Sequence, residues 1–248
     1  MGKTLWEFNL TLFLLNELSM KGTIGKIYHN PILAKIFHTS VSCLQNELSD
    51  CETVLDLGCG PYSPLQYCKG VKYSVGVEAF KPYLLQSQKR KIHTKYLGKK
   101  IEDLTFPPKS FDAVIMIEFL EYLPRELGEK TLKNASKWAR KKVVVSTPNG
   151  YFPMDNVDKN SWQKHRSGWV VEDFLKRGFV CHGLAGMKVL YSRESQVESM
   201  VSESENNLYA NIRFEPKKLF YILNSLLQIV SYYFPKVGFE LLAVKKIS

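Results

Sequence analysis

The chain lacks the cysteine patterns that mark a disulfide framework or a zinc site. Its 248 residues include five cysteines, an odd number, and no Cys-x-x-Cys pair occurs. Disulfide scaffolds use an even set of cysteines, and structural zinc sites commonly use such closely spaced pairs. These absences favour a protein of the reducing cytoplasm, and we expect no metal site.

Long uninterrupted apolar runs are also missing. Residues 4–20 place apolar side chains at helical spacing, but Glu7 and Asn9 interrupt them and no small-residue cleavage point follows. We therefore expect an amphipathic helix there and not a signal peptide. Segment 216–234 is nearly all apolar, yet four polar residues interrupt it and it is too short for a membrane span. It is expected to be core, a dimer face or a peripheral membrane contact.

Acidic residues are scarce relative to basic ones. The chain has 34 Lys and Arg against 24 Asp and Glu, a formal net charge of +10. The excess gathers in four clusters, at residues 89–91, 99–100, 140–142 and 164–166. Such clusters can meet phosphates or an anionic membrane, although basic runs at helix ends are also ordinary solvated surface. Because no RNA-binding module is recognisable, nucleic acid is a possible partner but not the favoured one.

Length and composition suit one α/β domain with additions. A hydrophobic content of 45% is ordinary for a globular protein of this size. We expect an N-terminal helical cap over residues 1–50, whose second helix runs from Pro31 to Leu48, and a main domain over 51–248. Within the main domain, residues 192–215 are expected to be mobile, and 216–234 to form a helical insertion before a last strand at 239–244.

Residues 53–80 predict half of a nucleotide-binding βαβ unit. Thr53 to Leu57 is a short, β-branched, apolar run, typical of a parallel strand covered on both faces. Gly58 and Gly60 follow its end, where glycine lets the backbone approach a ligand closely. The amides that open the next helix would add a partial positive charge at this edge of the sheet.

An acid and a missing glycine indicate which ligand the unit binds. Glu78 ends the next apolar run about 18 residues after Gly60, a spacing at which a carboxylate can accept hydrogen bonds from both ribose hydroxyls of an adenosine ligand. Ser63 stands where the dinucleotide fingerprint has its third glycine, and no Gly-Lys-Ser/Thr phosphate loop exists. A pyrophosphate ligand is therefore disfavoured.

Six segments in order resemble the class I S-adenosylmethionine-dependent methyltransferases, of the small-molecule, ubiquinone-pathway-like type. They are 54–60, 77–78, 102–107, 110–114, 118–124 and 146–149, so the resemblance covers roughly residues 50 to 185. It implies a Rossmann-like, doubly wound sheet of seven mostly parallel strands, and S-adenosylmethionine as cofactor. The expected strands include 111–117 and 142–146.

The resemblance also implies the cofactor contacts. These are Asp56, Gly58, Cys59, Gly60, Glu78, Ala79, Phe80, Ile101, Glu102 and Glu118, with Cys59 a packing residue and not a nucleophile. Many members have an acid for the adenine amino group at the position of Lys100. Adenine contact is therefore expected at the Ile101 backbone and at Glu102 instead.

Methyl transfer needs mainly binding and orientation, with a base where the acceptor is poorly acidic. The catalytic candidates are Glu121, Tyr122 and His165. Glu118 and Glu121, three residues apart, should share one helix face. In ubiquinone-pathway and small-RNA methyltransferases a similar stretch continues into a metal-binding histidine, which Tyr122 replaces here. His165 lies in the polar loop 151–168, which should overhang the acceptor, so burial in the core is not expected.

These observations predict methyl transfer to an oxygen or nitrogen of a small-molecule acceptor, with sugar- and lipid-linked molecules among the candidates. Two alternatives remain open. One is an RNA methyltransferase, which the basic clusters favour. The other is a protein that binds the cofactor but is an inactive regulator, since Lys100 and Tyr122 depart from the family pattern.

Overall fold

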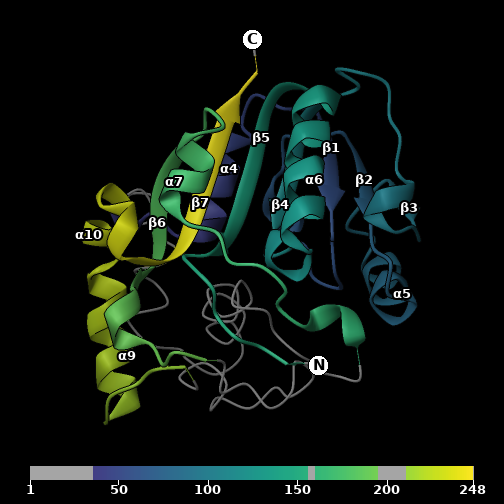
Figure 1. Ribbon diagram of the computed structural model, residues 1–248. Helices are drawn as coiled ribbons and strands as arrows, with labels where there is room; N and C mark the ends of the chain where they lie inside the picture. Colours follow the sequence, from purple (N-terminus) through teal and green to yellow (C-terminus); the bar gives the residue numbers. More distant parts are fainter. Residues whose placement is uncertain (1–35, 156–159, 195–210, 248) are drawn as a thin grey trace.

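A seven-stranded sheet runs through the structure, a computed structural model that describes residues 36–155, 160–194 and 211–247 (Figure 1). The strands are β1 (Thr53–Leu57), β2 (Tyr73–Val77), β3 (Lys95–Leu97), β4 (Phe111–Ile117), β5 (Ala139–Pro148), β6 (Val180–Met187) and β7 (Gly238–Lys246). Their order is β3-β2-β1-β4-β5-β7-β6, and only β7 runs antiparallel to its neighbours. The predicted α/β fold with a mostly parallel sheet is confirmed.

The central strands form because their residues are apolar on both sides. Every residue of β4 is buried, as expected of a parallel strand covered on both faces. Val114 and Met116 belong to one core cluster, whereas Ala113 and Ile115 belong to the cluster on the other face. Alternate side chains of β4 therefore pack into two hydrophobic layers, one on each face of the sheet.

Helices cover both faces of the sheet. They are α4 (Ser40–Glu47), α5 (Lys81–Arg90), α6 (Arg125–Trp138), α7 (Val171–Leu175), α9 (Lys217–Leu226) and α10 (Gln228–Tyr233). Helices α6 and α7 lie on the near face in Figure 1, and α4 lies behind the sheet. Leu132 of α6 packs in the first cluster and Leu44 of α4 in the second, which agrees with this layering.

Only part of the helical cap that is expected over residues 1–50 lies within the described residues. The helix expected over residues 4–20 and the start of the second helix lie outside them, as does most of the segment expected to be mobile. The described part of the second helix is α4, which Thr39 caps by accepting a hydrogen bond from the Ser42 N–H at 3.2 Å. Cys43, Leu44 and Leu48 pack it against the sheet.

The connection from β1 to β2 differs from the predicted strand–helix–strand unit. All residues of this connection are described, and none of them forms an α-helix. A 3₁₀ helix of four residues, Pro64–Tyr67, takes its place. Pro61 precedes this segment and Pro64 is its first residue, and a proline has no N–H to donate to a helical hydrogen bond. The expected partial positive charge of a long helix is therefore absent beside the glycine turn.

Candidate functional site

A cleft opens at the carboxyl edge of β1, β2 and β4, with an empty volume of about 980 Å³. One stretch of its lining comes from Gly58, Gly60, Pro61, Val77, Glu78, Ala79, Tyr83, Lys99, Lys100, Ile101 and Glu102. A second stretch comes from Glu118, Phe119, Tyr122, Leu123, Pro124, Leu127, Asn160, Trp162, Gln163 and Arg166.

Two glycines shape the floor of the cleft for different reasons. Gly58 has φ +72°, and a Cβ there would lie 2.0 Å from the Phe119 ring, so a larger residue has neither the conformation nor the space. Gly60 has φ +54°, but a Cβ there would meet nothing within 4 Å. Because Gly60 lines the cleft, this open side lets a ligand reach the backbone.

The Glu78 carboxylate is held by backbone amides at the end of β2. The Gly60 N–H donates to Oε2 at 3.2 Å and the Phe80 N–H donates to Oε1 at 2.7 Å. Burial raises the pKa of Glu78 to about 7, and these two amides oppose that shift by favouring the ionised form. The carboxylate is thus fixed in place on the cleft wall, where it can accept further hydrogen bonds from hydroxyl groups.

Asp56 lies beneath the cleft and not on its lining. It is 2% exposed, the Ser63 hydroxyl donates to its Oδ2, and the His93 Nε2 is 3.5 Å from the same atom. Burial raises the pKa of Asp56 to about 7 and lowers that of His93 to about 4, so His93 is neutral near pH 7. Asp56 therefore supports the glycine turn from inside the protein.

Two other expected cofactor residues also lie off the lining. Cys59 is buried, and burial raises the pKa of its thiol, which suits a packing residue. Phe80 packs edge-on against Tyr83, with ring centroids 4.9 Å apart. Ala79 and Glu102, by contrast, are on the cleft wall.

Lys100, the departure from the family pattern, takes part in the wall around Ile101. Its ammonium lies 5.4 Å from the centroid of the Trp162 ring, within range of a cation–π contact. Lys100 and Trp162 belong to the two separate stretches of the lining. This contact therefore joins the two stretches at one side of the cleft.

Glu118 occupies a strained position at the end of β4. Its φ of +48° is in the left-handed region, which is costly for a residue with a side chain and is often found at functional sites. The Ser146 hydroxyl donates to Glu118 Oε1 at 3.0 Å, and the Glu118 N–H donates to the Ser146 carbonyl at 3.0 Å. Glu118 is only 5% exposed, yet it lines the cleft.

Two more buried carboxyl groups adjoin Glu118. Glu121 and Glu240 are 2% and 0% exposed, and both interact directly with the Glu118 side chain. The Thr147 hydroxyl donates to Glu121 Oε2 at 3.0 Å, and Glu240 lies beside Ser146 and Glu118. We call Glu118, Glu121 and Glu240 the carboxyl cluster.

The carboxyl cluster holds protons near neutral pH. Burial is the main cause that raises all three pKa values, that of Glu118 to about 7 and those of Glu121 and Glu240 well above their usual range. No ion pair joins these groups to a Lys or Arg of the described residues. Sequence analysis missed Glu240, whose one signal is an acid within the apolar strand β7.

His165 is buried, so the expectation that its loop would keep it out of the core was wrong. It is 2% exposed, its Nδ1 bonds the Phe152 carbonyl, and its ring lies edge-on to Tyr122 with centroids 4.9 Å apart. The loop packs because the His165 N–H donates to the Met154 carbonyl at 3.1 Å and the Arg166 N–H to the Glu121 carbonyl at 2.8 Å. Burial lowers the pKa of His165 to about 4.

Of the three catalytic candidates, only Tyr122 lines the cleft. Glu121 lies behind Glu118 in the carboxyl cluster, and His165 packs against Tyr122. The expectation that Glu118 and Glu121 lie on the same side of the short helical turn after β4 agrees with their direct interaction. The structure thus leaves Glu118 as the member of this group with both a carboxylate and access to the cleft.

Residues 55–146 match the family model of a methyltransferase domain. This range contains the glycine turn, Glu78 and Glu118. No curated protein sequence matches the chain. The comparison with sequences therefore rests on the family model.

Several solved structures are similar. A Haloferax volcanii protein described as a methyltransferase, in complex with the Trm112 methyltransferase activator, is 15% identical with a TM-score of 0.50 over 97% of each chain. The methyltransferase domain of bacterial CtHen1 is 16% identical with a TM-score of 0.49, over 86% of this chain and 99% of that one. A protein of Archaeoglobus fulgidus is 18% identical with a TM-score of 0.48, over 88% and 99%. At such identities the likeness concerns the fold alone.

Proposed function

We propose that this protein is a class I S-adenosylmethionine-dependent methyltransferase that methylates an oxygen or nitrogen of a small-molecule acceptor, because residues 55–146 match the family model of a methyltransferase domain. The observation that carries the proposal is the composition of the cleft. One stretch of its lining offers glycine backbone and a fixed carboxylate, and the other offers aromatic and apolar side chains with a buried carboxyl group. The first suits a nucleoside and the second a compact acceptor.

The residues present fit S-adenosylmethionine, which supplies an electrophilic methyl group on a sulfonium when bound. Gly60 has open space where a Cβ would stand, so the backbone is accessible to a ligand. Glu78 holds its oxygens on the wall, where they can accept hydrogen bonds from two ribose hydroxyls. Ile101 and Glu102 would bound the adenine, as the sequence predicts.

The remaining lining is suited to a small acceptor. Tyr122, Leu123, Leu127 and Trp162 provide aromatic and apolar surface. Asn160, Gln163 and Arg166 add a small number of polar groups that can fix the orientation of a bound molecule. A mostly apolar cleft with few polar groups is typical of small-molecule sites. A sugar- or lipid-linked acceptor would use both kinds of surface.

Glu118 is the residue that we assign as proton acceptor. It lines the cleft, and the Ser146 hydroxyl stabilises its ionised form by donating to Oε1 at 3.0 Å. Because the pKa of Glu118 is raised to about 7, the group can take a proton from an acceptor hydroxyl or ammonium near neutral pH. Glu121 and Glu240 position it and tune its protonation from behind.

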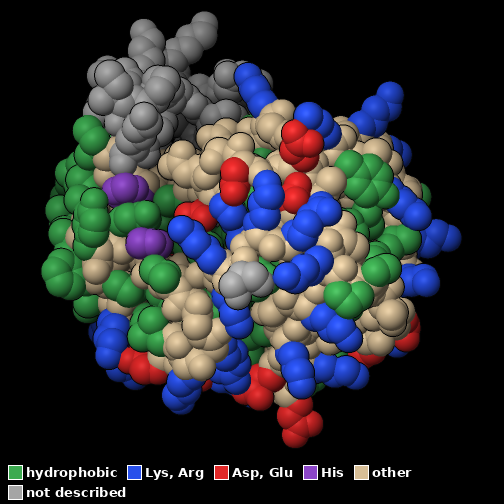
Figure 2. Space-filling view, turned by 90° about the horizontal axis from the view of Figure 1, so that it is seen from above, with side chains coloured by type: hydrophobic (Ala, Val, Ile, Leu, Met, Phe, Trp, Pro, Cys, Tyr) green, Lys and Arg blue, Asp and Glu red, His purple; other side chains and the backbone are tan. Residues whose placement is uncertain are grey.

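The basic clusters are divided between two regions, because Lys99, Lys100 and Arg166 line the cleft whereas the cluster at residues 140–142 does not. Residues 140–142 stand at the start of β5, whereas the cleft is at the end of the parallel strands. Lys and Arg side chains are spread over the face around the C-terminus, the end of the sheet opposite the cleft (Figure 2).

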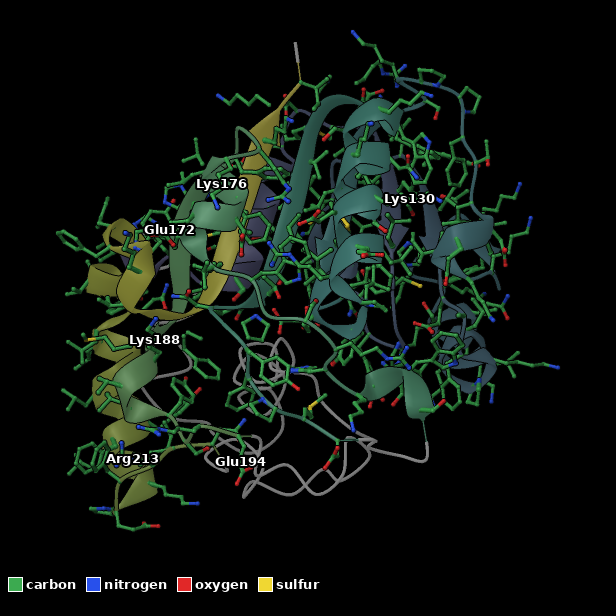
Figure 3. The ribbon with its side chains drawn as sticks, viewed as in Figure 1. Lys130, Glu172, Lys176, Lys188, Glu194 and Arg213 are labelled. Carbon is green, nitrogen blue, oxygen red and sulfur yellow. The ribbon has the colours of Figure 1, made fainter. Side chains whose placement is uncertain are left out.

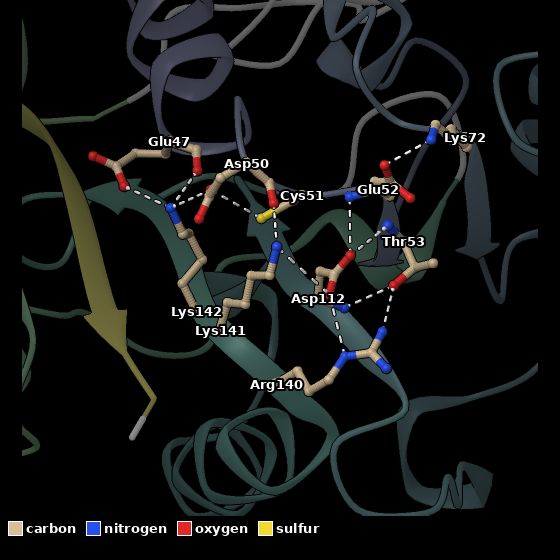
Figure 4. A network of polar contacts seen from close by, with 10 residues as sticks. All are labelled: Glu47, Asp50, Cys51, Glu52, Thr53, Lys72, Asp112, Arg140, Lys141 and Lys142. Atoms are coloured by element: carbon tan, nitrogen blue, oxygen red, sulfur yellow. Dashed lines mark hydrogen bonds and ion pairs between the residues drawn. The ribbon is translucent and has the colours of Figure 1, made fainter.

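Several of these basic side chains are already paired. Lys142 Nζ lies 2.8 Å from Asp50 Oδ1, and Arg140 Nε lies 3.1 Å from Asp112 Oδ1 (Figure 4). Lys72 Nζ lies 2.6 Å from Glu52 Oε1 in the same region. These ion pairs reduce the charge that is available for a phosphate backbone.

The test is transfer of isotope-labelled methyl groups from S-adenosylmethionine into two fractions, small molecules and total RNA. We expect label in the small-molecule fraction, lost in Glu118→Gln and retained in Glu126→Gln, an acid outside the cleft at the start of α6. Label in RNA alone would replace the proposal with the RNA alternative. Cofactor binding without label in either fraction would favour the inactive regulator.

A further inference from the structure

Helices α9 and α10 turn their apolar side chains outward. Seven large hydrophobic residues are each between 43% and 65% exposed: Leu219, Ile222, Leu223, Leu226, Val230, Tyr233 and Phe234. Their spacing of three, four and seven residues places them on one side of the helices. We call these seven residues the apolar face. The alternative that segment 216–234 is core is thus wrong for these side chains.

The opposite side of the same helices carries buried polar residues beside the partly buried rings of Phe220, Tyr221 and Tyr232. Asn224, Gln228 and Ser231 are 2%, 5% and 0% exposed. The Met187 N–H donates to Asn224 Oδ1 at 2.7 Å, and the Gly186 N–H donates to Gln228 Oε1 at 2.7 Å. Polar side chains, and not the apolar face, therefore make these hydrogen bonds with the β6 segment.

This arrangement depends on two glycines of β6. A Cβ on Gly183 would lie 2.3 Å from the Ser231 carbonyl oxygen, and one on Gly186 would lie 2.4 Å from Asn224 Oδ1. Only glycines allow the helices to approach β6 so closely. Turning the helices to bury the apolar face would break the bonds of Asn224 and Gln228 and leave buried polar groups without partners.

The apolar face forms one continuous edge of the molecule. Helices α9 and α10 run along the outer side of β6 (Figure 1), and hydrophobic side chains gather at the same side in the space-filling view (Figure 2). Val189 and Phe214 add exposed apolar surface, at 59% and 37%. A contiguous exposed patch of this kind marks a contact with a partner or a membrane.

The charges around the apolar face favour an anionic surface. Segment 216–236 contains three lysines and no acid. Lys188 and Arg213 lie beside α9, with Glu194 close by (Figure 3). Glu215 precedes α9, where it accepts a hydrogen bond from the Lys217 N–H, and Lys236 pairs with Glu172 at 2.6 Å. The chain as a whole carries +10.

We propose that the apolar face is a docking surface for an anionic lipid membrane, on which α9 and α10 lie in the plane of the interface. Apolar side chains on one side of a helix and lysines near its ends are what such interfacial helices need. None of the helices in the described ranges is long and apolar enough to cross a membrane. The docking does not depend on methyl transfer.

The test is sedimentation of the full chain with vesicles of phosphatidylcholine, with and without phosphatidylserine. Leu226→Glu combined with Val230→Glu places two charges on the apolar face. Leu85→Glu is the matched control, because Leu85 is 47% exposed on α5, at the other edge of the sheet. Far-UV circular dichroism checks that each variant is folded.

We expect the wild type and Leu85→Glu to bind the vesicles that contain phosphatidylserine, more weakly at high salt. The double variant should bind at least about tenfold more weakly, because charge is excluded from the acyl boundary. Absence of vesicle binding by the wild type, or equal binding by the double variant, would overturn the proposal. A dimer that the double variant abolishes would also overturn it and would assign the face to a second copy.

Discussion

The two ends of the cleft place different neighbours around their buried carboxyl groups. At the end of β2, Glu78 receives two backbone N–H groups, which hold its oxygens in place. At the ends of β4, β5 and β7, the carboxyl cluster brings three acids together. Burial raises the pKa of both Glu78 and Glu118 to about 7, so the two ends differ in what surrounds the acid and not in the direction of the shift. The proposed function assigns ligand binding to Glu78 and proton transfer to Glu118.

Removing the carboxylate of Glu118 should have the largest effect on activity. Glu118→Gln keeps the size of the side chain but cannot accept a proton, so kcat should fall by roughly 10²- to 10⁴-fold. The Kd for S-adenosylhomocysteine should change little, because Glu78 and the glycine turn remain. Steady-state kinetics and calorimetry measure the two quantities. Loss of cofactor affinity with unchanged kcat would contradict the assignment of proton transfer to Glu118 and would assign it to cofactor binding instead.

The two glycines of the turn should respond differently to the same substitution. Gly58→Ala adds a methyl group against Phe119 in a left-handed conformation, so the free energy of unfolding should fall by about 3 kcal/mol. Gly60→Ala is the matched control. Its added methyl group meets no other atom, so the free energy of unfolding should fall only by the backbone strain of about 1 kcal/mol. Its methyl group points into open space at the cleft and should weaken cofactor binding instead. Chemical denaturation and calorimetry distinguish the two results.

Glu78→Ala should weaken S-adenosylmethionine binding by about 1 to 3 kcal/mol, which is roughly 5- to 150-fold in Kd. The reason is the loss of an acceptor that is already oriented by the Gly60 and Phe80 amides. Glu52→Ala is a suitable control, because Glu52 lies at the opposite edge of the sheet in an exposed ion pair. Equal affinity in wild type and Glu78→Ala would refute the assignment of this carboxylate to the ribose.

The buried acids with raised pKa values, which are the carboxyl cluster together with Glu78 and Asp56, should make stability depend on pH. Acids with raised pKa values bind more protons in the folded state than in the unfolded state, so the free energy of unfolding should fall as pH rises from about 4.5 through 7. The slope is at most about 1.4 kcal/mol per pH unit for each proton. Glu240→Gln removes one such proton site and should reduce the slope.

Glu240→Gln should also shift the activity of the enzyme along the pH scale. Glu240 carries a proton near neutral pH, and its hydrogen bond to Glu118 lowers the pKa of Glu118. Replacing this O–H donor by the weaker amide donor should raise that pKa, so the midpoint of kcat against pH, expected near 7 in the wild type, should move to higher pH. Glu102→Gln, on the cleft wall but outside the cluster, serves as control. A midpoint that does not move would show that Glu240 does not influence the pKa of Glu118.

The sequence was sufficient to predict that Gly58, Gly60 and Glu78 lie together at the carboxyl edge of the sheet. Strands β1 and β4 are short, continuous apolar runs, for which few alternatives exist. Gly58 and Gly60 follow β1 directly, and Glu78 follows β2, so local chain geometry alone brings them to the same edge. The helix expected after Gly60 failed because two prolines outweighed the usual pattern of the βαβ unit.

The carboxyl cluster depends on tertiary structure and could not be predicted in full. Glu240 joins Glu118 only because β7 inserts between β5 and β6, a placement that no local pattern near Glu240 reveals. His165 was misjudged for a related reason. A polar loop is expected to be solvated, but backbone hydrogen bonds to Met154 and Glu121 draw this one inward.

The most direct test of the account is calorimetric titration of the protein with S-adenosylmethionine, S-adenosylhomocysteine and NAD. We expect micromolar binding of the two sulfur ligands and no binding of NAD, because the cleft offers Glu78 and an open Gly60 but no third glycine for a pyrophosphate. Binding of NAD, or binding of none of the three, would contradict the assignment of this cleft.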